Sequence, residues 1–326
     1  MKPVKWGVLG AAKFAREHMA RAIHAAEGAE FYAIATSSVE KAAPFQAFQP
    51  NLKVYTDYAE LLSDPDIDAV YIPLPNHLHV EWTIKALEAG KHVLCEKPIA
   101  MGEADFDRLI AARDASGKLA AEAFMIAHHP QFARAKEVLQ SGVLGDLVLV
   151  DTVFSFNNGA DKDNIRNRSE TAGGALGDIG VYAFGSVRMV TGEEPVQIRA
   201  TNIRRENGVD VFSQTLAEFP SFEYQGTVSM RMSNRQHLTF HGTKGHMTLT
   251  APYNAGVYDI AELTVEAPAM ERHVERWPAV NHYVLQVQNF CATVRNGAEY
   301  PVPLEFSRGT QAMTDMVIDK DHNTES

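Results

Sequence analysis

Short apolar runs alternate with helical patterns through the first third of the chain. The apolar runs predict strands at 4–10, 29–36, 53–55, 69–72, 92–95 and 119–124. The helical patterns between them lie at 15–26, 39–48, 58–62, 81–89 and 103–115. Strands that alternate with helices predict a parallel, doubly wound sheet of the α/β class. Six strands are enough for a complete dinucleotide-binding Rossmann domain, which we expect over residues 1–123.

The pattern changes in the second part of the chain. Alternating polar and apolar positions predict strands at 147–156, 196–204, 215–219, 223–232, 237–241 and 247–250. Helical patterns at 179–190 and 284–296 interrupt these strands. Several strands in succession indicate a largely antiparallel sheet, so we expect an α+β domain over residues 124–326. Two domains also suit a chain of 326 residues, which exceeds the usual size of one domain.

Composition and charge exclude several classes of protein. Hydrophobic residues make up 45% and charged residues 22%, as in ordinary globular proteins. The net charge is -11, and no stripe dense in Lys and Arg is present to follow a phosphate backbone, so nucleic acid is not an expected partner. No apolar run approaches the roughly 20 residues that span a bilayer. No secretory pattern opens the chain, so we expect no membrane association and a cytoplasmic location.

A glycine turn follows the first predicted strand. The spacing Gly7-x-x-Gly10-x-Ala12 leads from that strand into a helix. This is the context of a Rossmann phosphate turn, in which small residues let the backbone approach a pyrophosphate at the helix N-terminus. A simple tight turn is the alternative. We expect cofactor contacts from Gly7, Gly10, Ala12, Lys13 and Phe14.

The end of the second predicted strand bears on the choice between NADP and NAD. A site for NAD usually places Asp or Glu there to bind the ribose hydroxyls. This chain has Ser37 and Ser38 instead, with Lys41 one helical turn further on. Hydroxyls and an ammonium group can bind a 2′-phosphate, so NADP is the preferred cofactor, and use of NAD stays open. The alternative is that the two serines cap the following helix.

The tripeptide Glu96-Lys97-Pro98 follows the strand at 92–95. It therefore lies at the carboxyl end of the parallel sheet, where ligands bind in such folds. Glu96 and Lys97 are expected beside the cofactor, and Lys97 could bind a substrate hydroxyl and handle its proton. The alternative for Lys97 is a solvated loop lysine.

A second loop leaves the strand at 69–72. Its two prolines and an asparagine indicate a rigid loop under the nicotinamide. We expect cofactor contacts there from Pro73, Leu74, Asn76 and His77. His77 and His79 have no carboxylate or thiolate partner nearby in the sequence, so we expect no metal site and favour a role at a helix start.

A glycine-rich loop at 173–177 runs into a predicted helix. Asp178 and Tyr182 stand four residues apart and therefore share a helix face. Tyr182 could act as an acid or base if a cation, such as Lys97, lowered its pKa from about 10. The structural alternatives are a helix-start role for Asp178 and aromatic packing for Tyr182.

Taken together, these motifs resemble the glucose–fructose oxidoreductase, inositol dehydrogenase and rhizopine-catabolism oxidoreductase family (Gfo/Idh/MocA). The resemblance covers nearly the whole chain and includes Glu122-Ala123-Phe124-Met125 with His129-Pro130. Tyr182 and Asn164-Ile165-Arg166 look like the dihydrodiol dehydrogenase and D-xylose dehydrogenase branch. The family implies a Rossmann domain followed by an open-faced sheet, which often forms homodimers or homotetramers.

The resemblance also implies roles for individual residues. Lys97 and Tyr182 become the catalytic pair of an NAD(P)-dependent dehydrogenase that acts on a sugar, polyol or dihydrodiol. Asp178 orients a substrate hydroxyl, with further substrate contacts from Met125, His129 and Arg166. Relatives of this branch commonly show Tyr-Arg where this chain has Ile126-Ala127, so its substrate contacts are expected to differ.

Two other functions compete with this expectation. One is an NADP-binding sensor that kept the fold and lost the chemistry, because fold alone does not imply function. The presence of Lys97, Asp178 and Tyr182 argues against it. The other is a zinc-dependent dehydrogenase, for which the sequence offers no suitable ligand spacing.

Overall fold

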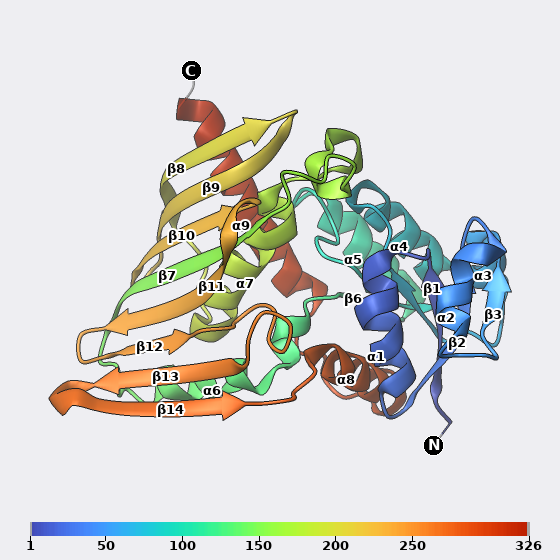
Figure 1. Ribbon diagram of the computed structural model, residues 1–326, viewed down its shortest axis with the longest axis horizontal. Coiled ribbons are helices and arrows are strands. Elements are labelled where there is room, and N and C mark those ends of the chain that lie inside the picture. Colours follow the sequence, from blue (N-terminus) through green and yellow to red (C-terminus); the bar gives the residue numbers. More distant parts are fainter. Residues whose placement is uncertain (1, 325–326) are drawn as a thin grey trace. The chain divides into compact units, whose positions relative to one another are not determined.

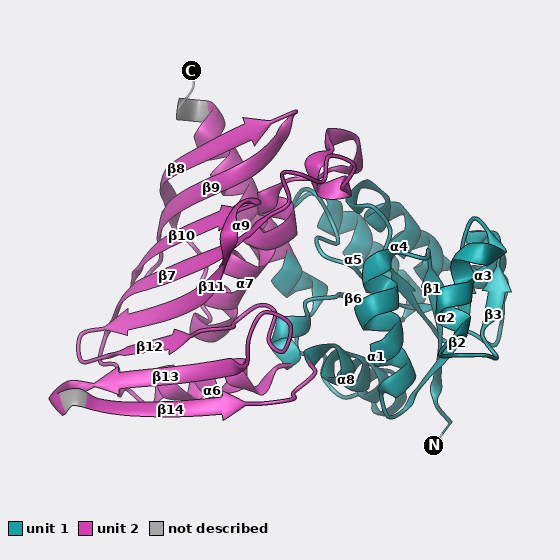
Figure 2. Ribbon diagram, in the orientation of Figure 1, with its two compact units in different colours: residues 1–128, 282–307 teal, residues 129–281, 308–326 magenta. Residues whose placement is uncertain are grey.

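The computed structural model describes residues 2–324. The chain forms two compact units, and each contains two stretches of sequence (Figure 2). Unit 1 consists of residues 1–128 and 282–307, and unit 2 consists of residues 129–281 and 308–326. A domain boundary between residues 123 and 124 stays a prediction.

Unit 1 contains a six-stranded parallel sheet, as the alternating pattern predicts (Figure 1). Its strands are β1 (Val4–Leu9), β2 (Ala29–Ala35), β3 (Lys53–Tyr55), β4 (Ala69–Ile72), β5 (His92–Cys95) and β6 (Ala120–Glu122). They lie in the order β3-β2-β1-β4-β5-β6, so the direction of winding reverses between β1 and β4. This reversal is the point at which doubly wound sheets bind their ligands, beyond the carboxyl ends of the strands.

Helices surround this sheet. They are α1 (Ala20–Ala25), α2 (Ala43–Gln46), α3 (Tyr58–Ser63), α4 (His79–Glu88), α5 (Asp105–Ser116) and α8 (His282–Asn296). A π-helical turn (Ala15–Met19) leads into α1, and short 3-10 turns lie at Val39–Ala42, Asn76–Leu78 and Met125–His128. Although α8 comes late in the sequence, its Phe290 ring packs 4.8 Å from that of Trp6 in β1. Both side chains are fully buried, so α8 completes the core of unit 1.

Unit 2 contains an eight-stranded sheet. Its strands are β7 (Leu147–Asn157), β8 (Gln197–Glu206), β9 (Val209–Glu218), β10 (Glu223–Ser229), β11 (Arg231–Gly242), β12 (His246–Leu249), β13 (Ala261–Ala267) and β14 (Glu271–Trp277). They lie in the order β14-β13-β12-β11-β7-β10-β9-β8. Neighbouring strands run antiparallel except β7 and β10, which are parallel. The expectation of a largely antiparallel sheet is confirmed.

The helices of unit 2 pack on one face of this sheet (Figure 1). They are α6 (Pro130–Gln140), α7 (Val181–Thr191) and the part of α9 (Leu304–Thr324) from residue 308 onwards. A π-helical turn (Leu176–Gly180) leads into α7, and 3-10 turns occupy Ile165–Asn167, Ser169–Thr171 and Pro268–Met270. No helix within residues 2–324 is both long enough and apolar enough to cross a membrane.

Four elements are absent from the sequence-based expectation: α6, α9, β13 and β14. The edge strand β14 carries charged residues on both faces because almost all of it is exposed, so it lacks the alternation of a half-buried strand. Helix α6 begins with Pro130 after His129, whose ring accepts a hydrogen bond from the Gln131 N–H. Histidine is not among the usual capping residues, so Pro130 at the first helical position is the start signal that was missed there.

Candidate functional site

The glycine turn lies at the carboxyl end of β1. Gly10 has a φ of 107°, which residues with a side chain rarely adopt, and its N–H donates to the carbonyl of Ala35 (2.8 Å). Helical backbone begins at Lys13. Gly7, in contrast, lies inside β1, where a Cβ would come within 2.7 Å of the Leu61 side chain. The turn itself is therefore built by residues 10–14, and Gly7 permits close packing of the strand.

The loop after β4 lies against this turn. A Cβ built on Gly10 would be 3.3 Å from Cδ2 of Leu74 and 3.5 Å from the hydroxyl of Tyr58. Leu74 is buried, whereas His77 at the start of the next helical turn is exposed. Because β1 and β4 are neighbours, the structure brings two of the predicted cofactor segments together at the reversal of strand order.

The residues predicted to determine the preference for NADP over NAD follow the end of β2. The Lys41 ammonium donates to the Ser37 hydroxyl (3.0 Å). Ser38 begins the following 3-10 turn without a side-chain cap bond. The pKa of Glu40 is lowered by its own backbone N–H and by the hydroxyl of Ser38. A hydroxyl, an ammonium group and a carboxylate therefore lie close together here, and the carboxylate opposes an anionic ligand.

The segment with Lys97 leaves β5, the strand next to β4. The Tyr71 hydroxyl donates to one oxygen of Glu96 (2.5 Å), and the other oxygen accepts a long bond from the Lys97 N–H (3.4 Å). Tyr71 is fully buried, and burial together with the Glu96 charge raises its pKa well above the ordinary value. The peptide between Lys97 and Pro98 is cis.

Two buried residues hold the same segment, and the sequence analysis gave neither of them this role. Glu122 accepts from the Ile99 N–H and from the Ser307 hydroxyl, both at 2.9 Å. The two ring nitrogens of His79 lie 2.7 Å from the carbonyl oxygens of Leu74 and Pro98. Both contacts depend on tertiary structure, so no local signal could reveal them.

In unit 2, Arg166 and Asp178 form an ion pair, with Nε of Arg166 2.6 Å from Oδ2 of Asp178. Asp178 lies inside the π-helical turn, and its N–H donates to the Gly174 carbonyl (3.1 Å). Asp178 therefore does not cap the helix. Its carboxylate is largely buried, and the Arg166 side chain is about one-third exposed. Two of the predicted substrate contacts are thus joined to each other.

Asp210 on β9 performs the capping role at this helix. Its Oδ2 accepts from the Leu176 N–H (2.7 Å), and a Cβ on Gly174 would lie 2.2 Å from its Oδ1. Burial raises the pKa of Asp210, and the N–H groups of Leu176 and Ala175 oppose that shift. The glycine loop therefore wraps closely around one carboxylate that lies far away in the sequence, which is why sequence analysis missed it.

Tyr182 lies on α7 with its side chain buried. Its ring centroid is 5.9 Å from that of Phe154 on β7 and 6.1 Å from that of Tyr253. Tyr182 thus packs between helix and sheet, as one of the two interpretations requires. Lys97 belongs to unit 1 and Tyr182 to unit 2, so their pairing stays a prediction.

The two remaining predicted substrate residues are both buried. Met125 begins the 3-10 turn at the end of the first stretch of unit 1. His129 belongs to unit 2, where it caps α6 and lies 6.3 Å from the Trp277 ring. Burial lowers the pKa of His129 to about 4. Within residues 2–324, no three His, Cys, Asp or Glu side chains are grouped as metal ligands.

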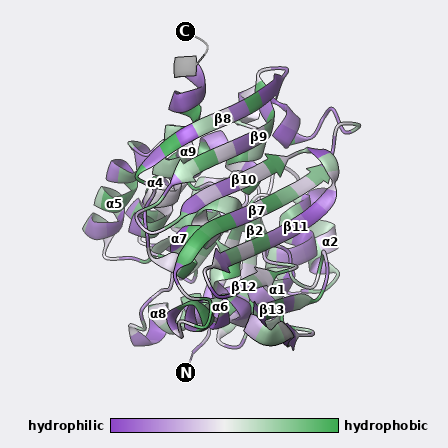
Figure 3. Ribbon diagram, turned by 90° about the vertical axis from the view of Figure 1, so that its left-hand side faces the viewer, coloured by the Kyte–Doolittle hydropathy of each residue, from purple (hydrophilic) through white to green (hydrophobic). Residues whose placement is uncertain are grey.

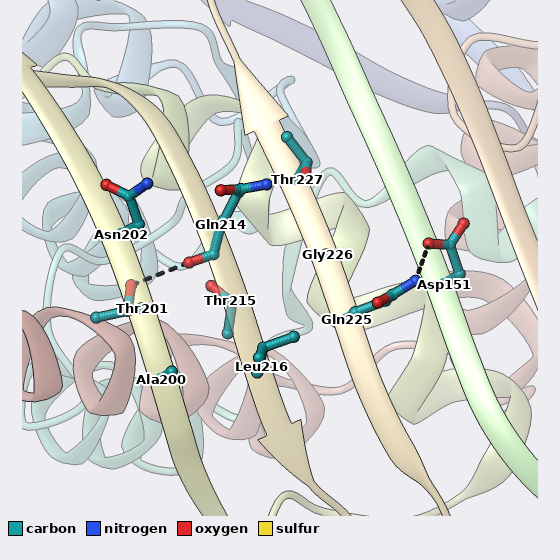
Figure 4. A pocket seen from close by; sticks show the side chains of 10 residues that line it. All are labelled: Asp151, Ala200, Thr201, Asn202, Gln214, Thr215, Leu216, Gln225, Gly226 and Thr227. Carbon is teal, nitrogen blue, oxygen red and sulfur yellow. Dashed lines mark hydrogen bonds between the residues drawn. The ribbon is translucent and has the colours of Figure 1, made fainter.

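The face of the second sheet opposite its helices, here called the open face, is turned toward the viewer in Figure 3, where the strands mix hydrophobic with hydrophilic residues. A hollow of about 350 Å³ lies over β7, β8, β9 and β10 (Figure 4). Its lining residues are Asp151, Ala200, Thr201, Asn202, Gln214, Thr215, Leu216, Gln225, Gly226 and Thr227. Gln225 donates to Asp151 (2.8 Å), and Asp151 also contacts His237. These contacts fix polar side chains on the outer face of the sheet.

Comparison with protein families identifies two matching models. Residues 4–124 match the model described as "Oxidoreductase family, NAD-binding Rossmann fold", and residues 132–248 match the GFO/IDH/MocA C-terminal domain. Together these matches cover most of both compact units.

Individual proteins are similar over almost the whole chain. An uncharacterized oxidoreductase from Rhizobium meliloti is 36% identical, with 97% of this chain and 96% of the relative covered. A D-xylose 1-dehydrogenase (NADP(+)) from Haloferax volcanii is 30% identical, with 96% of each chain covered. The crystal structure of a 3-ketoreductase from Actinomadura kijaniata, in complex with NADP and TDP-benzene, is 28% identical, has a TM-score of 0.90 and matches over 98% of each chain.

Proposed function

The chain belongs to the Gfo/Idh/MocA family of NAD(P)-dependent oxidoreductases, and we propose that it transfers a hydride between NADP and a carbon that carries a hydroxyl or carbonyl group in a sugar, polyol or dihydrodiol. The observation that carries this proposal is the convergence of the Gly10 turn, the Leu74 loop and the Lys97 segment at the carboxyl ends of β1, β4 and β5.

The residues at the ends of these strands fit a dinucleotide. Gly10 lets Leu74 and Tyr58 pack closely against the turn, and its backbone conformation leads the chain into a helix N-terminus that favours a pyrophosphate. Ala12, Lys13 and Phe14 continue this turn. Pro73, Leu74, Asn76, His77 and Glu96 are the further cofactor contacts that we propose. When bound, the nicotinamide supplies the hydride acceptor or donor.

In the proposed mechanism, Lys97 and Tyr182 handle the proton of the substrate hydroxyl. In the oxidative direction Tyr182 accepts the hydroxyl proton as the C–H hydride leaves, and the Lys97 ammonium holds the substrate oxygen. Asp178 accepts a hydrogen bond from a second hydroxyl of the substrate, and Arg166 fixes the Asp178 carboxylate. Met125 and His129 are the remaining proposed substrate contacts.

NADP is the proposed preferred cofactor and NAD the second. Ser37 and Lys41 already lie within hydrogen-bond distance of each other and offer a hydroxyl and a cation to a 2′-phosphate. The D-xylose dehydrogenase and the 3-ketoreductase named above both use or bind NADP, which supports the same choice.

A substrate panel with both cofactors tests the proposal. Pentoses, hexoses, inositols, trans-dihydrodiols and a TDP-linked keto sugar are assayed with NADP(H) and NAD(H) by absorbance of the nicotinamide. Turnover of at least one of these compounds, with a higher kcat/KM for NADP(H), is expected. Tight binding of NADPH without turnover of any compound would instead identify a sensor that kept the fold and lost the chemistry.

We also propose that the chain forms a homodimer or homotetramer through the open face of the second sheet. This face carries the hollow described above together with the exposed side chain of Leu216, beside polar groups that can exchange hydrogen bonds with a second copy. A stable contact of this kind buries about 800 Å² on each partner. Analytical ultracentrifugation of the wild type and of a Leu216→Arg variant tests it: the wild type should sediment as an oligomer, and the variant should dissociate. A monomeric wild type would contradict the proposal.

A further inference from the structure

His79 joins two segments that leave neighbouring strands. It is the first residue of α4, and its ring is fully buried. Nε2 lies 2.7 Å from the carbonyl oxygen of Leu74, in the loop after β4. Nδ1 lies 2.7 Å from the carbonyl oxygen of Pro98, in the segment after β5. One imidazole therefore spans the gap between the two segments.

The position of this link explains why it is needed. β4 and β5 pair through their last residues, Ile72 and Cys95, and one more backbone bond joins the Glu96 N–H to the Ile72 carbonyl (3.0 Å). Beyond that bond the strand pairing has ended. The His79 ring provides the next link between the two segments. Leu74 lies two residues beyond Ile72, and Pro98 lies two residues beyond Glu96.

The two partners of the ring are both carbonyl oxygens, which only accept hydrogen bonds. A neutral imidazole can donate to one of them, and a protonated imidazole to both. Burial lowers the pKa of His79, and the nearby Lys97 and His77 also lower it, whereas the bonds to Pro98 and Leu74 raise it. At least one of the two bonds is formed in either state, and the ring fills the space between the segments in both.

Each end of the link lies next to a residue of the proposed site. The Leu74 side chain lies against the Gly10 turn, and Pro98 directly follows Lys97. Tyr71 holds Glu96 and Glu122 holds Ile99 on either side of the same segment. His79 adds a contact that reaches across to the loop after β4.

We propose that His79 is a positioning residue that fixes the backbone of Lys97 relative to the loop at 73–76, by joining the carbonyls of Leu74 and Pro98. It does not touch the substrate. This inference rests on the proposed function through the role of Lys97.

A double-mutant cycle between His79 and Lys97 tests the inference. His79→Phe keeps a buried ring without donors, His79→Gln restores an N–H donor, and Lys97→Ala removes the group to be positioned. For His79→Phe we expect kcat to fall about 10- to 100-fold, and His79→Gln should recover most of that loss. In the Lys97→Ala background, His79→Phe should change kcat less than about 3-fold, because the group it positions is gone.

His92 provides a matched control. It is a half-buried histidine at the amino end of β5, the strand that leads to Lys97, and its ring accepts from the Leu119 N–H (2.9 Å). His92→Asn should lower the melting temperature with kcat unchanged, which separates loss of stability from loss of positioning.

The outcomes distinguish this inference from the proposed function. If Lys97→Ala lost activity but His79→Phe and His79→Gln kept wild-type kcat, the positioning role would be wrong while the function stood. Equal effects of His79→Phe in both backgrounds would also overturn it. Full turnover by Lys97→Ala would overturn this inference and the proton role of Lys97 while hydride transfer stood, and failure of the proposed function would instead appear as absence of turnover by the wild type in the substrate panel. If His79→Phe failed to fold, the same cycle is run with His79→Leu, which also lacks a donor, and unchanged kcat or additive effects of that variant would count against the inference.

Discussion

Arg166 and Asp178 hold each other through an ion pair whose N–O distance is 2.6 Å. The sequence suggested each of them separately as a substrate contact. Their pairing means that one oxygen of the carboxylate is occupied and that its direction is fixed before a substrate arrives. Such preorganisation would lower the entropic cost of the hydrogen bond that we propose between Asp178 and a substrate hydroxyl.

The first prediction concerns this ion pair. Asp178→Asn should lower kcat/KM for the substrate by about 10- to 100-fold, because a hydrogen bond to a charged group contributes about 1.5–3 kcal/mol. Arg166→Ala should act in the same direction, and the double variant should lose less than the two single losses combined. The dissociation constant of NADPH, measured by fluorescence, should stay unchanged. Additive losses would show that the two residues act independently.

The second prediction concerns the proton carrier. Tyr182→Phe removes only the hydroxyl and should lower kcat by about 10²- to 10⁴-fold, because general acid–base catalysis contributes that much. Tyr253→Phe is the matched control, since Tyr253 is buried in the same aromatic cluster. Its kcat should stay near the wild-type value. Full turnover by Tyr182→Phe would remove Tyr182 from the mechanism.

The third prediction concerns cofactor choice. Lys41→Ala should lower kcat/KM for NADP about 10-fold and leave that for NAD unchanged, because only NADP carries the 2′-phosphate. Glu40→Gln should shift the ratio toward NADP, since it removes the carboxylate that binds Ser38. Lys85→Ala, at an exposed lysine of α4, is the control. Equal losses with both cofactors in Lys41→Ala would contradict this assignment.

The fourth prediction concerns acid stability. Burial lowers the pKa of His128 from 6.5 to about 3. Between those values the unfolded chain binds a proton that the folded chain does not, so stability is lost as the pH falls below 6.5. The slope should be about 1.4 kcal/mol per pH unit for this histidine.

Urea unfolding of His128→Phe between pH 7 and pH 4 measures that contribution. The variant loses the contact between His128 and Asn289, so its stability at pH 7 should be lower. Its stability should, however, fall less steeply with acid than that of the wild type. Parallel stability curves for the two proteins would show that His128 is protonated in the folded state or plays no part.

Buried parallel strands were the easiest elements to predict. The bounds of β4 and β5 agree with the apolar runs, because a strand covered on both faces has few polar positions. In the second sheet only one face is covered, and β9 begins at Val209 rather than at residue 215. Its first residues include the half-buried Asp210, which accepts a hydrogen bond from the Leu176 N–H, and this bond makes a charged residue acceptable there.

The candidate site also contains residues that could be placed from the sequence and residues that could not. The glycine turn and Glu96-Lys97-Pro98 could be placed from sequence because their position after a strand defines them. His79 and Glu122 could not be assigned, because the fold alone brings them near their partners, which are three backbone groups and the Ser307 hydroxyl. The Arg166–Asp178 pair also joins residues 12 positions apart through an irregular loop, which no periodic pattern describes.

The assignment of residues 282–307 to unit 1 has a consequence during synthesis. The first 128 residues emerge from the ribosome roughly ten to thirty seconds before α8, at a translation rate of about 5–20 residues per second. Until then Trp6 lacks the Phe290 ring that covers it in the finished protein. The nascent Rossmann domain thus lacks this cover for about half of translation, and the apolar surface around Trp6 is where a chaperone would be expected to bind it.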